Sequence, residues 1–161
     1  MEVISNSRAA TDTRHRIAHP NSNPRMIKVV GIGAGGSAST AKLLSRGLRN
    51  VQVVDAPAGS KAAASPEEML ETIRAQGVDL AQSLKGADML FMVAHAIDDV
   101  GIAPVIKHLG RQSNVLITGI LIQDKQQSSE ATLEILRGAS DMLIVASDDS
   151  YVVDMLEELG A

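Results

Sequence analysis

The run Gly31-Ile32-Gly33-Ala34-Gly35-Gly36 has the residue types and spacing that best suit a chemical task. It follows an apolar strand-like run, 27–32, and precedes helical sequence that we expect to begin at about Ser37. Glycines let the backbone adopt positive φ and approach a ligand with no Cβ in between. Because free N–H groups and the positive end of the helix dipole also suit phosphate, we predict a phosphate-binding turn here. Its residues are Gly31, Gly33, Ala34, Gly35, Gly36 and Ser37. The alternative is a tight strand–helix turn that binds nothing.

Asp55 is the residue that would extend this turn into a dinucleotide site. It lies 19 residues after Gly36, at the end of a second predicted strand, 51–55. A dinucleotide fingerprint places a ribose-binding acid about 20 residues after its glycines. One hypothesis is therefore a small NAD(P)-binding protein that uses Gly31, Gly33, Gly36 and Asp55. An aspartate after a strand is also common because it stabilises turns, so both interpretations remain open.

Three further side chains lie in the loop after the third predicted strand, 87–94. His95 is the best candidate for an acid–base group, although no second member of a catalytic set accompanies it, and we predict no catalytic residue. Asp98 or Asp99 is expected to cap the helix that carries Pro104. The alternative is that the two carboxylates hold Mg²⁺ against a phosphate, but we expect no metal.

Composition excludes several classes of function. The 161 residues are 45% hydrophobic and 21% charged, which fits one globular domain. Phe91 is the single phenylalanine and Tyr151 the single tyrosine, and the formal charge is −4, so neither base stacking nor a basic surface for nucleic acid is indicated. Without cysteine there are no disulfides and no thiolate metal ligands.

The expected organisation is a flexible tail over residues 1–26 followed by a domain over residues 27–161. No apolar run approaches the ~18 residues of a membrane span, and the first residues lack the apolar core of a signal peptide. We therefore expect no membrane span and a cytoplasmic location.

Strands and helices alternate along the domain. Strands are predicted at 27–32, 51–55, 87–94, 115–122 and 142–146, with helices between and after them. One helix is expected over 65–85, begun by a Ser65 cap and Pro66, with Gly77 interrupting its pattern without ending it. This alternation predicts an α/β fold in three layers, a Rossmann-like parallel sheet of about five strands with helices on both faces. Ligands bind such sheets at the carboxyl ends of the strands.

The chain also resembles a known family over most of its length. Residues 27–36 resemble the first strand and phosphate loop of FtsZ, the bacterial tubulin-like GTPase. Ser65-Pro66-Glu67 is similar to the family's Asn-Pro-Glu loop, and 85–91 to the strand before its glycine-rich signature. Residues 103–106, Gly119 and 140–145 with Asp149 match in order. The resemblance implies an FtsZ nucleotide-binding domain whose third strand is deleted, with the 27–32 strand between those at 51 and 87, and those at 115 and 142 beyond.

Departures from the family pattern imply a degenerate GTP site. The family's signature loop, Gly-Gly-Gly-Thr-Gly-Thr-Gly, is replaced by a shorter stretch from His95 to Gly101 in which only Gly101 is retained. Pro57-Ala58-Gly59 replaces a further nucleotide loop, and the family's central helix and C-terminal domain have no counterpart in this sequence. We expect GTP or GDP to bind at best with micromolar affinity, at the turn from Gly33 to Ser37, and Gly35→Val to abolish that binding.

The expected partners follow from the same resemblance. The chain should have no GTPase activity of its own and should act as a binding or assembly protein. Self-association or an FtsZ-like protein is the expected partner, with NAD retained as the alternative cofactor.

Overall fold

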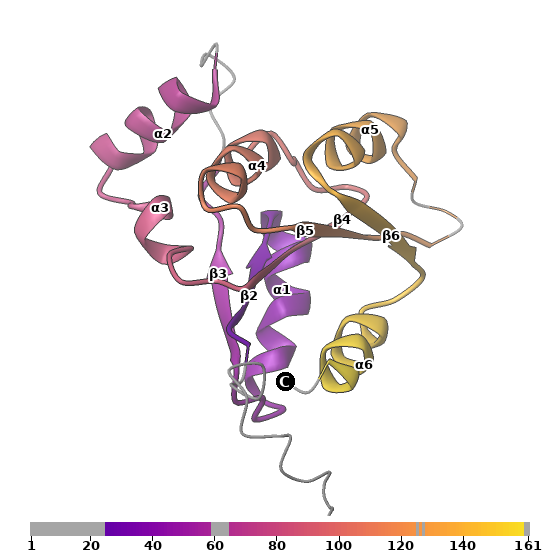
Figure 1. The fold of residues 1–161 in the computed structure, drawn as a ribbon. Coiled ribbons are helices and arrows are strands. Elements are labelled where there is room, and N and C mark those ends of the chain that lie inside the picture. Colours follow the sequence, from indigo (N-terminus) through magenta and orange to yellow (C-terminus); the bar gives the residue numbers. More distant parts are fainter. Residues whose placement is uncertain (1–24, 59–64, 125, 127, 160–161) are drawn as a thin grey trace, which may run out of the picture.

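Five parallel strands form one sheet at the centre of the molecule (Figure 1). The structure is a computed structural model that describes residues 25–58, 65–124, 126 and 128–159. The strand order is β3-β2-β4-β5-β6, which confirms the predicted order and directions. The bounds are β2 (Ile27–Gly31), β3 (Val51–Asp55), β4 (Met89–His95), β5 (Ile117–Ile122) and β6 (Met142–Ala146).

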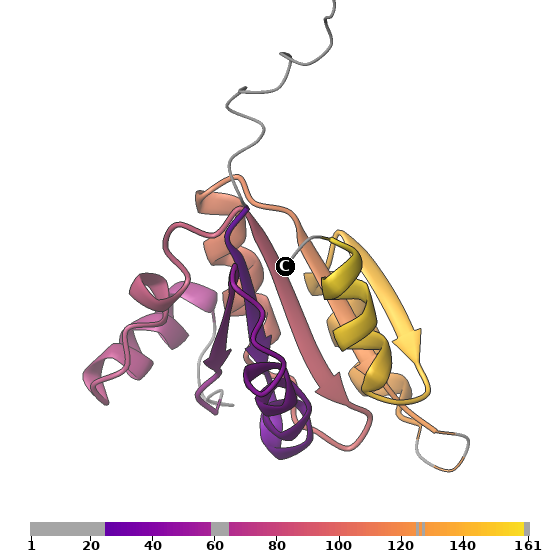
Figure 2. The ribbon, with the colours of Figure 1, turned by 90° about the horizontal axis from the view of Figure 1, so that it is seen from below.

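Helices cover both faces of the sheet, which confirms the predicted three layers (Figures 1 and 2). One face carries α1 (Gly33–Leu44) and α6 (Ser150–Glu158). The other carries α2 (Pro66–Ala75), α3 (Leu80–Ser83), α4 (Ala103–Gln112) and α5 (Glu130–Ala139). No helix within the described ranges has the length and apolar character that a membrane crossing needs.

The central strands are apolar because both of their faces are covered. Along β4, Met92 packs in the core beneath α4, whereas Phe91 and Val93 pack in the core on the α1 and α6 side. Successive side chains of a strand point to opposite faces, so a continuous apolar run supplies both cores. The paired register sets Gly31 opposite Asp55 on one side and opposite Val93 on the other. The carboxyl ends of these strands therefore lie level at one edge.

The predicted tail, 1–26, falls mostly on residues 1–24, which lie outside the described part of the chain. Met26 belongs to the folded domain. Its N–H donates to Asp88 Oδ2 at 2.8 Å, and its carbonyl accepts from the Asp88 N–H at 2.8 Å. These two bonds anchor the entry into β2.

The helix predicted over 65–85 is two helices, so the prediction that Gly77 would not end it was wrong. Its start is confirmed, since Ser65 Oγ accepts the Glu68 N–H at 3.1 Å. α2 ends at Ala75 because Gly77 adopts φ +89°, the left-handed conformation that closes helices. The Gly77 N–H then donates to the Arg74 carbonyl, and α3 begins separately at Leu80.

The glycine run forms the first turn of α1 rather than a loop in front of it, since the helix begins at Gly33 and not at about Ser37. Gly36 lies where α1 crosses β4. A Cβ at this position would come within 2.2 Å of the Val93 carbonyl oxygen, a backbone atom, so the helix or the strand would have to shift. The helix therefore contacts the sheet backbone directly at Gly36.

We expect Gly36→Ala to destabilise the fold by about 3 kcal/mol, because the added methyl group must push α1 away from β4. Gly138→Ala is the matched control, since Gly138 is also helical but a Cβ there meets nothing within 4 Å. That variant should gain up to about 1 kcal/mol. Urea denaturation followed by circular dichroism measures both, and equal stabilities of the two variants would contradict the packing.

Candidate functional site

The carboxylate of Asp98 lies on the first turn of α1, where the sequence predicts a phosphate. Its Oδ1 accepts the N–H of Gly35 at 3.0 Å. Its Oδ2 accepts the N–H of Gly36 at 2.9 Å and the N–H of His95 at 2.7 Å. Two of these donors are the helix-start amides that were assigned to a ligand. The predicted phosphate position is thus filled by a side chain of the same protein.

A tight turn after β4 brings Asp98 into this place. The Asp98 N–H donates to the His95 carbonyl at 3.0 Å, which folds the chain back over the end of the strand. On the opposite side, Gly33 has φ +74°, and a Cβ there would lie 2.6 Å from Asp98 Cγ. A Cβ at Gly35 would lie 2.9 Å from Asp98 Oδ2. The glycines therefore leave room for a carboxylate, as they would for a phosphate.

The prediction that Asp98 or Asp99 caps the following helix was wrong. α4 begins at Ala103 after Ile102, without a side-chain cap. Asp99 accepts the N–H of Gly101 at 2.9 Å, a bond within its own loop. Asp98 instead caps α1, a helix more than sixty residues earlier, because its two oxygens satisfy two orphan donors there and a third on β4.

A second cluster of polar contacts joins His95 to α1. The His95 Nε2 atom lies 2.7 Å from Ser39 Oγ, and Ser39 Oγ donates to Asp149 Oδ2 at 3.1 Å. Lys42 Nζ donates to the same oxygen at 2.7 Å. Since the serine hydroxyl has one hydrogen and gives it to Asp149, the His95 Nε2 atom donates to Ser39.

This cluster contains serine, histidine and aspartate but not the arrangement of a nucleophilic triad. In a triad the aspartate orients the imidazole and the imidazole activates the serine. Here the carboxylate of Asp149 bonds to Ser39 directly, and Ser39 is buried at 2% exposure. The cluster therefore links β4 and α1 to the start of α6. The sequence did not identify Ser39 and Lys42 as part of a site. Their spacing of three residues places them on one helix face, but no sequence pattern indicates that they contact Asp149.

Electrostatics hold Asp149 in its charged form. The hydrogen bond from Lys42 is the largest cause that lowers the pKa of the Asp149 carboxyl, and the Ser39 hydroxyl and the Lys42 charge act in the same direction. Partial burial opposes them, yet the pKa remains below its ordinary value.

The remaining predicted site residues lie around the closed turn. Ala34 is exposed, Ser37 is half-buried, and the Gly101 N–H is held by Asp99. Asp55 is exposed at the end of β3, beside Gly31 in the register. Next to it lies a cavity of about 220 Å³. Its lining residues are Ile32, Gly33, Ala56, Pro57, Ala58 and Asp99.

A second cavity, of about 280 Å³, lies at the carboxyl ends of β4, β5 and β6. It is lined by His95, Ile122, Gln123, Asp124, Ser147, Asp148 and Asp149. Three of these side chains are acidic and none is lysine or arginine, so this cavity does not suit a phosphate. Within the described ranges, no three histidine, cysteine or acidic side chains are grouped so that they could hold a metal ion.

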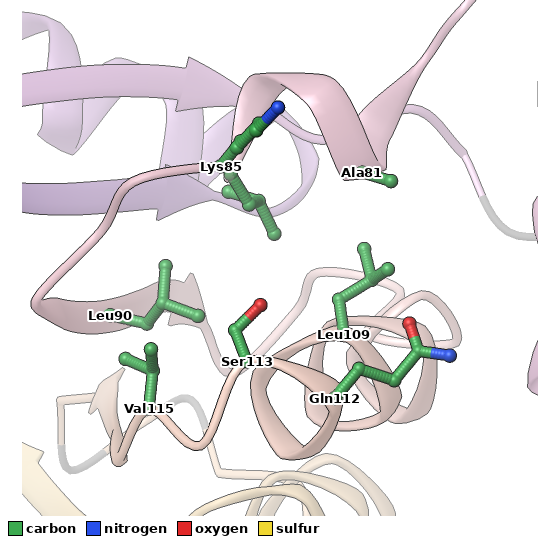
Figure 3. A pocket seen from close by; sticks show the side chains of 8 residues that line it. Ala81, Lys85, Leu90, Leu109, Gln112, Ser113 and Val115 are labelled. Carbon is green, nitrogen blue, oxygen red and sulfur yellow. The ribbon is translucent and has the colours of Figure 1, made fainter.

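A third cavity lies at the opposite end of the sheet, between α3 and α4 (Figure 3). Leu90, Leu109 and Val115 give it a largely aliphatic wall. Its volume of about 100 Å³ matches only a few water molecules. It is too small for a nucleotide and remote from the glycine turn.

Comparison with solved structures bears on the fold. The chain is similar to a single-substitution mutant of FtsZ from M. jannaschii, with a TM-score of 0.61, 17% identity, and coverage of 84% of this chain and 56% of that one. It is also similar to an empty FtsZ dimer from M. jannaschii, with a TM-score of 0.58, 19% identity, and coverage of 76% and 45%. The chain has an FtsZ-like fold.

The likeness extends no further than the fold. At these identities it shows shared architecture, and the chain spans about half the length of the FtsZ chains it matches. No family model matches the sequence.

We expect Asp149→Asn to flatten the acid dependence of stability. A carboxyl with a lowered folded-state pKa contributes stability above its unfolded-state pKa and loses it as the pH falls through the folded value. Wild type should therefore lose this contribution as the pH falls below about 4, and the variant should not. Denaturant unfolding from pH 7 to pH 3 measures this, with Asp154→Asn on the exposed face of α6 as control. Parallel curves for wild type and Asp149→Asn would contradict the role of the Lys42 contact.

Proposed function

We propose that this protein is an FtsZ-like nucleotide-binding-domain protein with a degenerate GTP site, which acts by binding or assembly and not by hydrolysis. One observation carries the proposal. The carboxylate of Asp98 accepts the N–H groups of Gly35, Gly36 and His95, where a phosphate would have to bind.

The energetics favour the closed turn. Hydrogen bonds to a charged group contribute roughly 1.5–3 kcal/mol each, and Asp98 makes its bonds without losing the translational freedom that a free ligand loses on binding. A phosphate that displaced Asp98 would also remain near its charge. At about 5 Å and an effective dielectric near 20, that repulsion costs roughly 3 kcal/mol. This corresponds to about two orders of magnitude in affinity.

The same contact argues against the dinucleotide alternative. NAD would need its pyrophosphate on the same helix start, so Asp98 opposes NAD and GTP alike. Asp55 has the position that a ribose-binding acid requires, but this position alone does not distinguish the two ligands. The similarity of the fold to FtsZ favours GTP or GDP as the ligand that a degenerate site would retain.

The absence of hydrolysis follows from the surroundings of the turn. His95, the residue best placed to activate a water, has its Nε2 atom committed to the buried Ser39. Its backbone N–H is committed to Asp98. The Nδ1 atom is then the acceptor of the ring, but Asp98 already occupies the N–H groups that would have to hold a phosphate in place for a water to attack.

Calorimetric titration with GTP, GDP and NAD tests the closed turn. Wild type should bind all three more weakly than micromolar, and Asp98→Ala should bind GTP and GDP about tenfold to a hundredfold more tightly. Asp99→Ala is the matched control and should gain much less, because Asp99 accepts the Gly101 N–H within its loop and its removal leaves Asp98 on the N–H groups of Gly35 and Gly36. Adding Gly35→Val to Asp98→Ala should abolish the gain.

Circular dichroism establishes that each variant is folded before titration. Nanomolar binding of GTP to wild type, or an Asp98→Ala variant with no gain in affinity, would contradict the proposal.

Phosphate-release assays test the second half of the proposal. With millimolar GTP, the protein should release no phosphate above the buffer rate and should form no filaments by light scattering or electron microscopy. The assay is repeated with an added FtsZ, whose own activity is the positive control. GTP-dependent filaments of this chain alone that turn over phosphate would show that the site is functional.

A further inference from the structure

The side chain of His95 lies against the glycine turn, beside the carboxylate of Asp98. A Cβ built on Gly35 would come within 2.8 Å of His95 Cγ and within 2.9 Å of His95 Cβ. The same Cβ would lie 2.9 Å from Asp98 Oδ2. The open side of Gly35 is therefore covered by an imidazole as well as by a carboxylate.

Ser39 holds the imidazole in this place. Gly35 and Ser39 are four residues apart on α1, so they lie on the same face of the helix. The His95 ring spans the two, because its Nε2 atom lies 2.7 Å from Ser39 Oγ. The Ser39 hydroxyl is itself fixed, since it is buried at 2% exposure and donates to Asp149 Oδ2 at 3.1 Å.

We propose that the His95 side chain is a second block of the glycine turn and that Ser39 is the positioning residue that keeps it there. The inference rests on the proposed function, in which Asp98 excludes phosphate from the N–H groups of Gly35 and Gly36. It adds that the removal of Asp98 opens the turn only in part, because the imidazole stays against Gly35.

The shape of a phosphate group explains the second block. A carboxylate is flat, whereas a phosphate is tetrahedral and projects further around the N–H groups that hold it. On the side of Gly35 it would meet the Cβ and Cγ atoms of His95. The ring then has to turn away, and this movement breaks its bond to Ser39. Phosphate binding therefore leaves a buried hydroxyl without the donor that it has in the closed turn.

This coupling determines the expected affinities. The net contribution of one hydrogen bond corresponds to about twofold to tenfold in an equilibrium constant. Ser39→Ala should therefore tighten the binding of GTP and GDP by about this factor. His95→Ala should tighten it at least as much, because the ring and its bond are removed together. The two gains should not add, since Ser39 acts only through the ring.

Calorimetric titration of the full chain with GTP and GDP tests the coupling, after circular dichroism has established that each variant is folded. The background is Asp98→Ala, to which Ser39→Ala, His95→Ala and both together are added. Ser45→Ala is the matched control. Ser45 is the residue that follows α1, and its hydroxyl donates to the Lys42 carbonyl at 2.8 Å. Its removal costs a hydrogen bond that does not involve His95, so the affinity should stay that of the background.

A conservative substitution separates positioning from a general loss of structure. His95→Gln keeps an N–H donor that can reach the Ser39 hydroxyl, so it should bind nucleotide as the background does. Equal gains for His95→Gln and His95→Ala would overturn the proposal. This comparison decides the question even if Ser39→Ala fails to fold.

The same substitutions made singly in wild type allow the two proposals to fail separately. If Asp98→Ala tightens binding and neither Ser39→Ala nor His95→Ala adds to it, the second block is wrong and the proposed function stands. If His95→Ala alone tightens binding and Asp98→Ala does not, the proposed function is wrong and the imidazole is the block. Additive gains of Ser39→Ala and His95→Ala would contradict the role of Ser39, and no gain in any variant would overturn both proposals.

Discussion

The contact between the Asp98 carboxylate and the start of α1 is the interaction on which the rest of the site depends. The first N–H groups of any helix lack partners within it, and the helix dipole makes that end attractive to an anion. Asp98 meets both needs and also accepts the N–H of His95. The N–H groups that a bound anion would otherwise occupy are therefore bonded within the protein itself. The same contact joins β4 to α1 at the carboxyl edge of the sheet, where ligands of such sheets bind.

The other contacts around the site extend from this one. Gly36 lets α1 approach the backbone of β4, and that approach brings Ser39 to the imidazole of His95. Ser39 and Lys42 then hold Asp149 at the start of α6. His95 is thus bonded through its backbone to one element and through its ring to another. The face of the sheet covered by α1 and α6 is held together at its carboxyl edge by a continuous set of charged and hydroxyl groups.

The sequence predicted the layers and the strand order because apolar runs alternate with amphipathic ones, and few parallel topologies satisfy that pattern. It failed at Gly77, since Leu80 and Leu84 continue the apolar spacing of α2 across a residue whose left-handed backbone ends the helix. It located the glycine turn but not what fills it. Asp98 reaches Gly35 through the turn that follows His95, and the same residue spacing would have allowed a cap on α4 instead.

The glycine turn has a consequence for how such chains change through descent. A side chain at Gly33 or Gly35 would clash with Asp98, and a side chain at Gly36 would clash with the backbone of β4. Selection for a stable fold alone would therefore preserve these positions, with or without any nucleotide. A lineage can lose the ligand and still inherit the glycine pattern that once accommodated it. The pattern then records the packing of a helix against a strand, and the residue that distinguishes an open turn from a closed one lies in a different loop.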